Sequence, residues 1–132
     1  GVGPEDIDVT GSYDAFTFTT MLQLEDYGFC KKGEGGAYVS DGTIRLGGRR
    51  PNNTSGGHLC EGYTHGQNMV IENVRQLRHD ADDSCPIGPD GKRQHTYDYR
   101  EGGCRQVKRC ELTANLGWAN PGTGSAMVMR RD

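Results

Sequence analysis

The stretch that decides the fold is Asn53-Thr-Ser-Gly-Gly-His-Leu-Cys-Glu-Gly-Tyr-Thr-His-Gly66, a glycine-rich loop that leads into a predicted helix ending at Arg78. A helix begins with backbone N–H groups that have no partner and with the positive end of its dipole. Such a terminus can hold a phosphate, a thioester oxygen or an enolate, and it can lower the pKa of a phenol or thiol beside it. The loop therefore contains the first candidate functional residues.

Two helices are predicted from apolar residues that recur every three or four positions. The first covers residues 13–25, with Ser12 as its N-cap, Gly28 as its end, and Phe18 and Leu22 on its apolar face. The second begins near Cys60 or Thr64. Its predicted buried residues are Met69, Val70, Val74 and Leu77. Its predicted solvent-facing residues are Glu72, Arg75, Gln76 and Arg78.

Short extended segments surround these helices. We expect a strand over residues 7–9 and two closing strands within 105–116 and 125–129, joined by a turn at 117–124. Residues 80–104 contain few large aliphatic side chains and are longer than an ordinary loop, which predicts a loop insertion. The chain is thus predicted to be a single domain that contains both helices and strands.

Composition excludes several classes of protein. The 15 Lys and Arg residues nearly balance the 18 Asp and Glu residues, so we expect no nucleic-acid partner. No apolar run is long enough to span a bilayer, and no signal peptide is visible, so we expect a cytoplasmic protein. Leu, Ile, Val and Phe together number only 21 of 132 residues. We therefore expect the domain to complete its core against another part of a larger assembly.

The five cysteines cannot all pair within one chain, because their number is odd. With no Cys-x-x-Cys motif and no secretory signal, we expect reduced thiols. A zinc site formed by Cys85, His95, Cys104 and Cys110 is conceivable, but these spacings match no common set of zinc ligands. No metal site is therefore predicted.

Several motifs resemble the C-terminal half of a thiolase. They are Tyr13-Asp-Ala-Phe16, the segment from Leu24 to Gly36, the loop Gly56-Gly-His-Leu-Cys-Glu-Gly-Tyr-Thr-His-Gly66 and Glu72-Asn-Val-Arg-Gln-Leu-Arg78. More narrowly they resemble the lipid-transfer branch, which includes sterol carrier protein X-type thiolases and bacterial steroid side-chain aldolases. The resemblance covers residues 1–78 and the closing strands within 105–129, and the 80–104 segment fits the aldolase subgroup. It implies an α/β fold, with residues 1–132 as a C-terminal thiolase-like domain of layered αβα architecture in which helices cover a mixed sheet.

The chain departs from thiolases at the positions that carry their chemistry. Tyr13 stands where thiolases have Asn or His, and Tyr63 stands where they have His. The 117–124 turn lacks the cysteine that acts as acid and base in the Claisen reaction of thiolases. The nucleophilic cysteine of thiolases belongs to an N-terminal half that this chain does not contain. The resemblance therefore implies retro-aldol cleavage of a β-hydroxyacyl-CoA, which needs a base, an acid and an oxyanion site, but neither a nucleophile nor a metal.

The resemblance also suggests a role for each loop residue. We expect Tyr13 to be the base for the substrate hydroxyl and Tyr63 the proton partner of the enolate, although the two roles could be reversed. His58 and His65 flank Tyr63 and either tune its proton or order the loop. Gly57 belongs to the same substrate and oxyanion environment. Cys60 is a candidate nucleophile, but a packing role is favoured because relatives carry a small residue there.

The family implies a steroid CoA thioester with a 17-hydroxyl group as substrate, and a 17-keto steroid and propionyl-CoA as products. CoA is part of the substrate, so no cofactor is expected. The implied partners are the N-terminal half of the thiolase fold, a second copy in a thiolase-like dimer, and an OB-fold protein with a zinc ribbon. Two alternatives remain open at this point: a non-catalytic scaffold that binds acyl-CoA or lipid, and an acyltransferase that uses Cys60.

Overall fold

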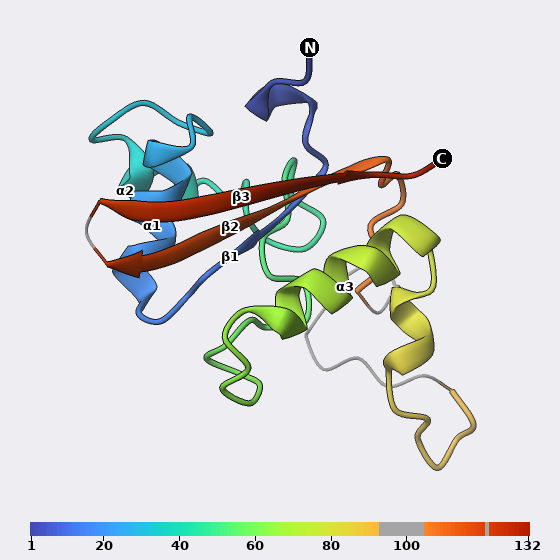
Figure 1. Ribbon diagram of the computed structural model, residues 1–132. Coiled ribbons are helices and arrows are strands. Elements are labelled where there is room, and N and C mark those ends of the chain that lie inside the picture. Colours follow the sequence, from blue (N-terminus) through green and yellow to red (C-terminus); the bar gives the residue numbers. More distant parts are fainter. Residues whose placement is uncertain (93–104, 121) are drawn as a thin grey trace.

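The computed structural model describes residues 1–92, 105–120 and 122–132. Its centre is a three-stranded mixed sheet in the order β1 (Val9–Ser12), β2 (Leu112–Asn120), β3 (Thr123–Arg130). Strand β1 runs parallel to β2, and β2 runs antiparallel to β3 (Figure 1). The parallel pair joins the two ends of the chain, so the sheet forms only when residues about 100 positions apart come together.

Helices cover the two faces of this sheet. Helices α1 (Thr17–Asp26) and α2 (Gly35–Ser40) lie on one face, where Leu24 packs with Ala114 and Leu116. Helix α3 (Gln67–Arg78) lies on the other face, where Leu77 packs with Val9 and Cys110. Two short 3-10 helices, η1 (Pro4–Asp6) and η2 (Ala81–Ser84), complete the described elements. The predicted layered α/β architecture with a mixed sheet is confirmed.

Helix α1 differs from its prediction in both start and orientation. It begins at Thr17 rather than 13, and Ser12 ends β1 instead of capping the helix. The Tyr13 N–H bonds to the Leu116 carbonyl at 3.0 Å, which continues the pairing with β2 and keeps residue 13 extended. The predicted apolar face is wrong, because Phe18 and Leu22 are 50% and 43% exposed. The buried residues of the helix are Thr19, Thr20, Gln23 and Leu24.

Helix α3 ends at Arg78 as predicted and buries Met69 and Leu77 as predicted, but its buried face also contains polar residues. Glu72 and Gln76, predicted to face water, are 2% and 0% exposed. One Glu72 carboxylate oxygen accepts hydrogen bonds from the Thr54 hydroxyl at 2.7 Å and the Gln76 amide at 3.3 Å. The other oxygen lies 2.9 Å from the Arg105 guanidinium. The prediction fails because a paired charge can be buried when all its polar atoms find partners.

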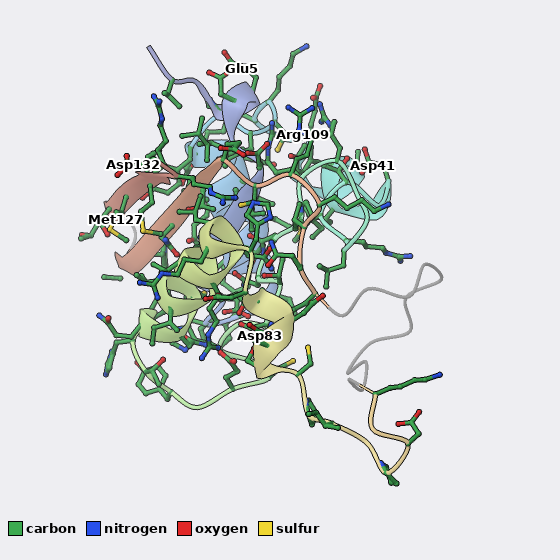
Figure 2. All side chains as sticks on the ribbon, turned by 90° about the vertical axis from the view of Figure 1, so that its right-hand side faces the viewer. Glu5, Asp41, Asp83, Arg109, Met127 and Asp132 are labelled. Atoms are coloured by element: carbon green, nitrogen blue, oxygen red, sulfur yellow. The ribbon has the colours of Figure 1, made fainter. Side chains whose placement is uncertain are left out.

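The closing strands extend further than expected. Strand β2 continues to Asn120 through much of the predicted 117–124 turn, so the hairpin is longer and its turn shorter. Strand β3 forms one edge of the sheet and is mostly exposed, with Met127 40% and Val128 54% exposed. The labelled Met127 lies at the outer rim of the molecule (Figure 2). The sheet therefore leaves an open edge on this side.

The cysteines do not all follow the prediction of reduced thiols. Cys85 is disulfide-bonded, whereas Cys30, Cys60 and Cys110 are free. A disulfide-bonded Cys85 cannot serve as a zinc ligand. The other proposed ligands, His95 and Cys104, lie outside the described residues, as does the 93–104 part of the predicted insertion. Within the described ranges, no helix is long and apolar enough to cross a membrane.

Candidate active site

Tyr13 stands where β1 ends and the chain turns toward α1. Gln23, 1% exposed on α1, holds its backbone at both ends. The Gln23 side-chain oxygen accepts the Tyr13 N–H at 2.9 Å, and its amide nitrogen donates to the Tyr13 carbonyl at 2.7 Å. The backbone position of Tyr13 is thus fixed from the helix as well as from β2.

The loop with Tyr63 is tied to the same strand end. Asn53 pairs with both backbone groups of Ser12, accepting its N–H at 2.8 Å and donating to its carbonyl at 3.0 Å. The buried Asp14 carboxylate accepts the N–H of His58 at 2.8 Å and that of Leu59 at 3.5 Å. These bonds position the loop beside Tyr13 although 41 to 45 residues separate the partners.

Gly57 is required at this junction by its geometry. Its φ of +67° lies in the left-handed region, and a Cβ atom there would come within 2.4 Å of the Asp14 carboxylate and 2.7 Å of the Asn53 amide. The predicted role of Gly57 in the oxyanion environment stays a prediction. Its position also gives it a structural role, because it lets the loop approach Asp14 closely.

The two predicted tyrosines come together. The Tyr13 hydroxyl donates to the Tyr63 hydroxyl across 3.5 Å. This hydrogen bond, with a smaller effect of burial and of the nearby Tyr63 charge, raises the pKa of Tyr13 above its usual value. Tyr63 itself is 73% exposed, so its hydroxyl is open to a ligand. The pair thus joins one phenol that keeps its proton to one that accepts a hydrogen bond.

Both predicted histidines surround this pair. The rings of Tyr13 and His58 lie 4.6 Å apart, edge to face, and those of Tyr63 and His65 lie 4.5 Å apart. Neither ring nitrogen of His58 has a hydrogen-bond partner within the described part of the chain, although both are buried. Buried polar atoms normally find partners, so an unpaired imidazole is a feature that a bound ligand could satisfy.

The N-terminus of α3 closes the site. Gly66, its N-cap residue, adopts a left-handed φ of +88°, and a Cβ atom there would lie 3.4 Å from the Tyr13 ring. The positive end of the helix dipole thus lies beside the tyrosine pair, where it favours negative charge. Cys60 lies in the same loop, but it is exposed and its thiol is free.

Two of the site's anchors were missed by the sequence analysis. Gln23 and Asn53 each use one amide side chain to bind both backbone groups of another residue. The spacing of apolar residues does not predict such a side-chain-to-backbone bond. The position of Asn53 at the start of the glycine-rich loop is the feature of the sequence that could have indicated its role. Among the described residues, no three His, Cys, Asp or Glu side chains are placed to hold a metal ion.

The sequence matches the thiolase C-terminal domain-like family over residues 1–87. The chain belongs to this family. It is 51% identical over 78 residues to the 17-hydroxy-3-oxo-4-pregnene-20-carboxyl-CoA lyase of Mycobacterium tuberculosis, covering 59% of this chain and 20% of that protein. It is 46% identical over 78 residues to the steroid side-chain-cleaving aldolase of Thermomonospora curvata, with the same coverage. The predicted resemblance to this branch of the thiolase superfamily is confirmed.

The fold matches a solved structure of the same group. The Ltp2-ChsH2(DUF35) aldolase aligns over 100% of this chain and 28% of that one, with a TM-score of 0.76 and 29% identity. The chain thus spans about a fifth of the curated aldolase and lyase above and 28% of the structural neighbour.

Proposed function

We propose that this chain supplies the acid–base pair of a thiolase-fold aldolase that cleaves the side chain of a β-hydroxyacyl-CoA steroid. The single observation that carries the proposal is the 3.5 Å approach of the Tyr13 and Tyr63 hydroxyls at the N-terminus of α3. The names of the steroid lyase and aldolase relatives support the substrate class.

For this reaction the protein needs to supply a base and an acid that move protons, and the carbon–carbon bond breaks without a nucleophile from the protein. A base takes the proton of the β-hydroxyl group, and the bond between the β and α carbons breaks. Its electron pair becomes a thioester enolate while the β carbon becomes a ketone. An acid then protonates the α carbon of the enolate. Two phenols beside a helix N-terminus suit these steps, because the dipole stabilises a phenolate or an enolate.

The surroundings of Tyr13 support the second of the two assignments left open by the sequence. The Tyr13 hydroxyl lies 3.5 Å from that of Tyr63, and the raised pKa of Tyr13 keeps its proton in place. We therefore assign Tyr63 as the hydroxyl base and Tyr13 as the proton donor to the enolate. His58 and His65 hold the two rings in contact, and His58 offers an unpaired imidazole to the thioester oxygen.

The remaining parts of the enzyme are proposed from the same relatives. A chain that spans about a fifth of the aldolase needs the N-terminal half of the thiolase fold. The structural neighbour carries a second component, ChsH2(DUF35), in its name, which supports a protein partner. That this partner is an OB-fold protein with a zinc ribbon is proposed on the resemblance alone. A thiolase-like dimer is proposed on the resemblance alone, and a 17-hydroxy steroid substrate is proposed from the name of the lyase relative.

Tyrosine-to-phenylalanine variants test the proposal in the assembled enzyme. Tyr13→Phe and Tyr63→Phe keep the rings and remove only the hydroxyls, so each should lower kcat by about 10²–10⁴-fold. KM should change little, because the lost interaction acts in the transition state. Cys60→Ala should leave turnover unchanged. If Cys60→Ala abolishes turnover while both phenylalanine variants remain active, an acyltransferase replaces the aldolase, and no turnover in any form favours a binding scaffold.

A second measurement separates the two roles. Propionyl-CoA incubated with the enzyme in D₂O should exchange its α protons, because in the reverse of enolate protonation the conjugate base of the acid takes the α proton and the hydroxyl base is not needed. We expect Tyr13→Phe to lose this exchange and Tyr63→Phe to retain it. The opposite pattern would restore Tyr13 as the hydroxyl base.

A further inference from the structure

The loop that carries Tyr63 begins and ends at left-handed residues. Gly56 and Gly57 precede it with φ values of +104° and +67°, and His65 and Gly66 end it with φ values of +52° and +88°. His65 is not a glycine, so its left-handed backbone is strained, and such strain clusters at active sites and switch regions. Residues of this kind at both ends of a loop are suited to act as hinges, because changes in their φ and ψ reorient the residues between them.

Residues 58–65, which we call the hinged segment, have few bonds to the rest of the molecule. The residues from position 59 onward are all exposed, and the chain directly before α3 projects from the body of the molecule (Figure 1). At the start of the segment, two N–H groups donate to the Asp14 carboxylate. Near its end, Glu61 and Thr64 bond to Asn68 in the first turn of α3 through exposed side chains, whose bonds water can replace. Within the described part of the chain, opening of the segment therefore breaks few bonds.

The hinged segment places the Tyr63 ring beside two other side chains of the site. Its ring centroid lies 5.7 Å from that of His58, and its hydroxyl lies 3.5 Å from that of Tyr13. Tyr63 is 73% exposed, whereas both ring nitrogens of His58 are buried and have no hydrogen-bond partner among the described residues. The closed arrangement thus buries an unpaired imidazole, which disfavours it relative to an arrangement in which the imidazole finds a partner.

A substrate oxygen cannot reach the imidazole of His58 while both of its nitrogens are covered. Tyr13 cannot move away easily, because its backbone is bonded to Gln23 and to Leu116. Tyr63 and His58 both lie on the hinged segment. Movement at the hinges separates Tyr63 from Tyr13 and opens the imidazole to solvent or to a ligand.

We propose that the hinged segment is a lid that opens to admit the thioester and closes when the thioester oxygen accepts a hydrogen bond from the His58 imidazole. The proposal rests on the proposed function and adds a conformational step that controls access to the site. A ligand shifts such an equilibrium only by binding one state better than the other. The thioester oxygen gives the imidazole the partner that the closed state otherwise lacks. Closure also returns Tyr63 to Tyr13, so the acid–base pair is assembled over bound substrate.

The variant His58→Phe tests the lid without any ligand. Phenylalanine keeps an aromatic ring and has no nitrogen to bury, so the closed state should become more stable. The Leu59 amide, which donates to Asp14 in the closed state, should then exchange with solvent about tenfold more slowly than in the wild type of the assembled enzyme. A purely structural role of His58 predicts unchanged or faster exchange, and either result in a folded variant would overturn the proposal.

The wild type provides a second measurement that needs no variant. Propionyl-CoA, which has the thioester but no steroid, should slow exchange of the Leu59 amide saturably, and free CoA should leave it unchanged. Ala114, 3% exposed in β2, is the internal reference for global stability. If His58→Phe also loses protection at Ala114, the variant is misfolded and the wild-type measurement decides. Absence of slowing at saturating propionyl-CoA would contradict the lid.

Two variants show whether the response to propionyl-CoA passes through the imidazole. His58→Phe should show no further slowing when propionyl-CoA is added. Ile71→Ala is the matched control, because Ile71 is 51% exposed on α3 and lies outside the hinged segment, so its response should equal that of the wild type. An undiminished response in His58→Phe would overturn the assignment of His58 as the group that closes the lid.

The outcomes also separate the lid from the proposed reaction. Slower Leu59 exchange in ligand-free His58→Phe, together with no cleavage of a steroid thioester by the wild type, refutes only the reaction. Cleavage that depends on Tyr13 and Tyr63, with Leu59 exchange unaffected by His58→Phe and by propionyl-CoA, refutes only the lid.

Discussion

Replacing Gly57 with alanine tests how the loop with Tyr63 is held beside Tyr13. The new Cβ atom would lie 2.4 Å from the Asp14 carboxylate and 2.7 Å from the Asn53 amide, well inside contact distance. Neither neighbour is free to move, because Asp14 accepts the His58 N–H and Asn53 holds both backbone groups of Ser12. The clash must therefore displace the loop from its anchors.

The size of the effect follows from two contributions. A residue with a side chain in the left-handed region costs about 1 kcal/mol relative to glycine. Losing the 2.8 Å hydrogen bond from His58 to the Asp14 carboxylate costs about 1.5–3 kcal/mol, since the acceptor is charged. Together these give roughly 3 kcal/mol for opening of the loop, which is about a hundredfold in the opening equilibrium.

Amide hydrogen exchange of His58 and Leu59 measures this opening directly. In Gly57→Ala both amides should exchange about a hundredfold faster than in the wild type, and kcat should fall with them. Gly62→Ala is the matched control in the same loop, because a Cβ atom at Gly62 would have no atom within 4 Å and the φ of Gly62 is not positive. Wild-type exchange and turnover in Gly57→Ala would refute the anchoring role of Asp14.

Three further predictions concern the buried charges, the thiols and metal. Glu72→Ala should destabilise the protein by about 3–5 kcal/mol in urea unfolding by leaving Arg105 unpaired, and the double replacement Glu72→Met with Arg105→Met should recover most of the loss. Iodoacetamide at about pH 8 should modify Cys60 but spare Cys110, whose pKa burial raises to about 12; equal labelling in peptide mass spectra would contradict this. Elemental analysis of the purified chain should find no stoichiometric metal, since the proposed reaction uses only protein acids and bases, and tightly held zinc would overturn that expectation.

The sequence predicted the layers of the fold and the identity of the tyrosine pair for different reasons. Alternating and helical periods placed the elements, because strands and helices bury one face each. Periodicity carries no information on which loops meet, so the approach of Tyr13 to Tyr63 came from the resemblance to thiolases. The structure supplies the physical cause of that approach, which is the set of side-chain bonds from Asp14, Gln23 and Asn53 to backbone groups.

The prediction for α3 was right for Met69 and Leu77 and wrong for the buried polar residues Glu72 and Gln76. Helical periodicity equates polar residues with solvent, and this rule fails when a polar side chain has a partner in the interior. Gln76 reaches the Arg105 carbonyl at 2.7 Å, and Glu72 reaches Thr54 and Arg105. These partners are 18 to 33 residues distant, so no local window around the helix contains the information.

Helix α1 is the clearest case, because its buried polar residue has a role at the candidate site. Gln23 points inward and binds both the N–H and the carbonyl of Tyr13, so a polar residue is buried where it fixes a proposed catalytic tyrosine. Phe18 and Leu22 point outward and line a cavity with the end of the β2–β3 hairpin. The pattern of apolar residues within the helix does not predict this orientation, because the bonds of Gln23 run to the backbone of a residue outside the helix.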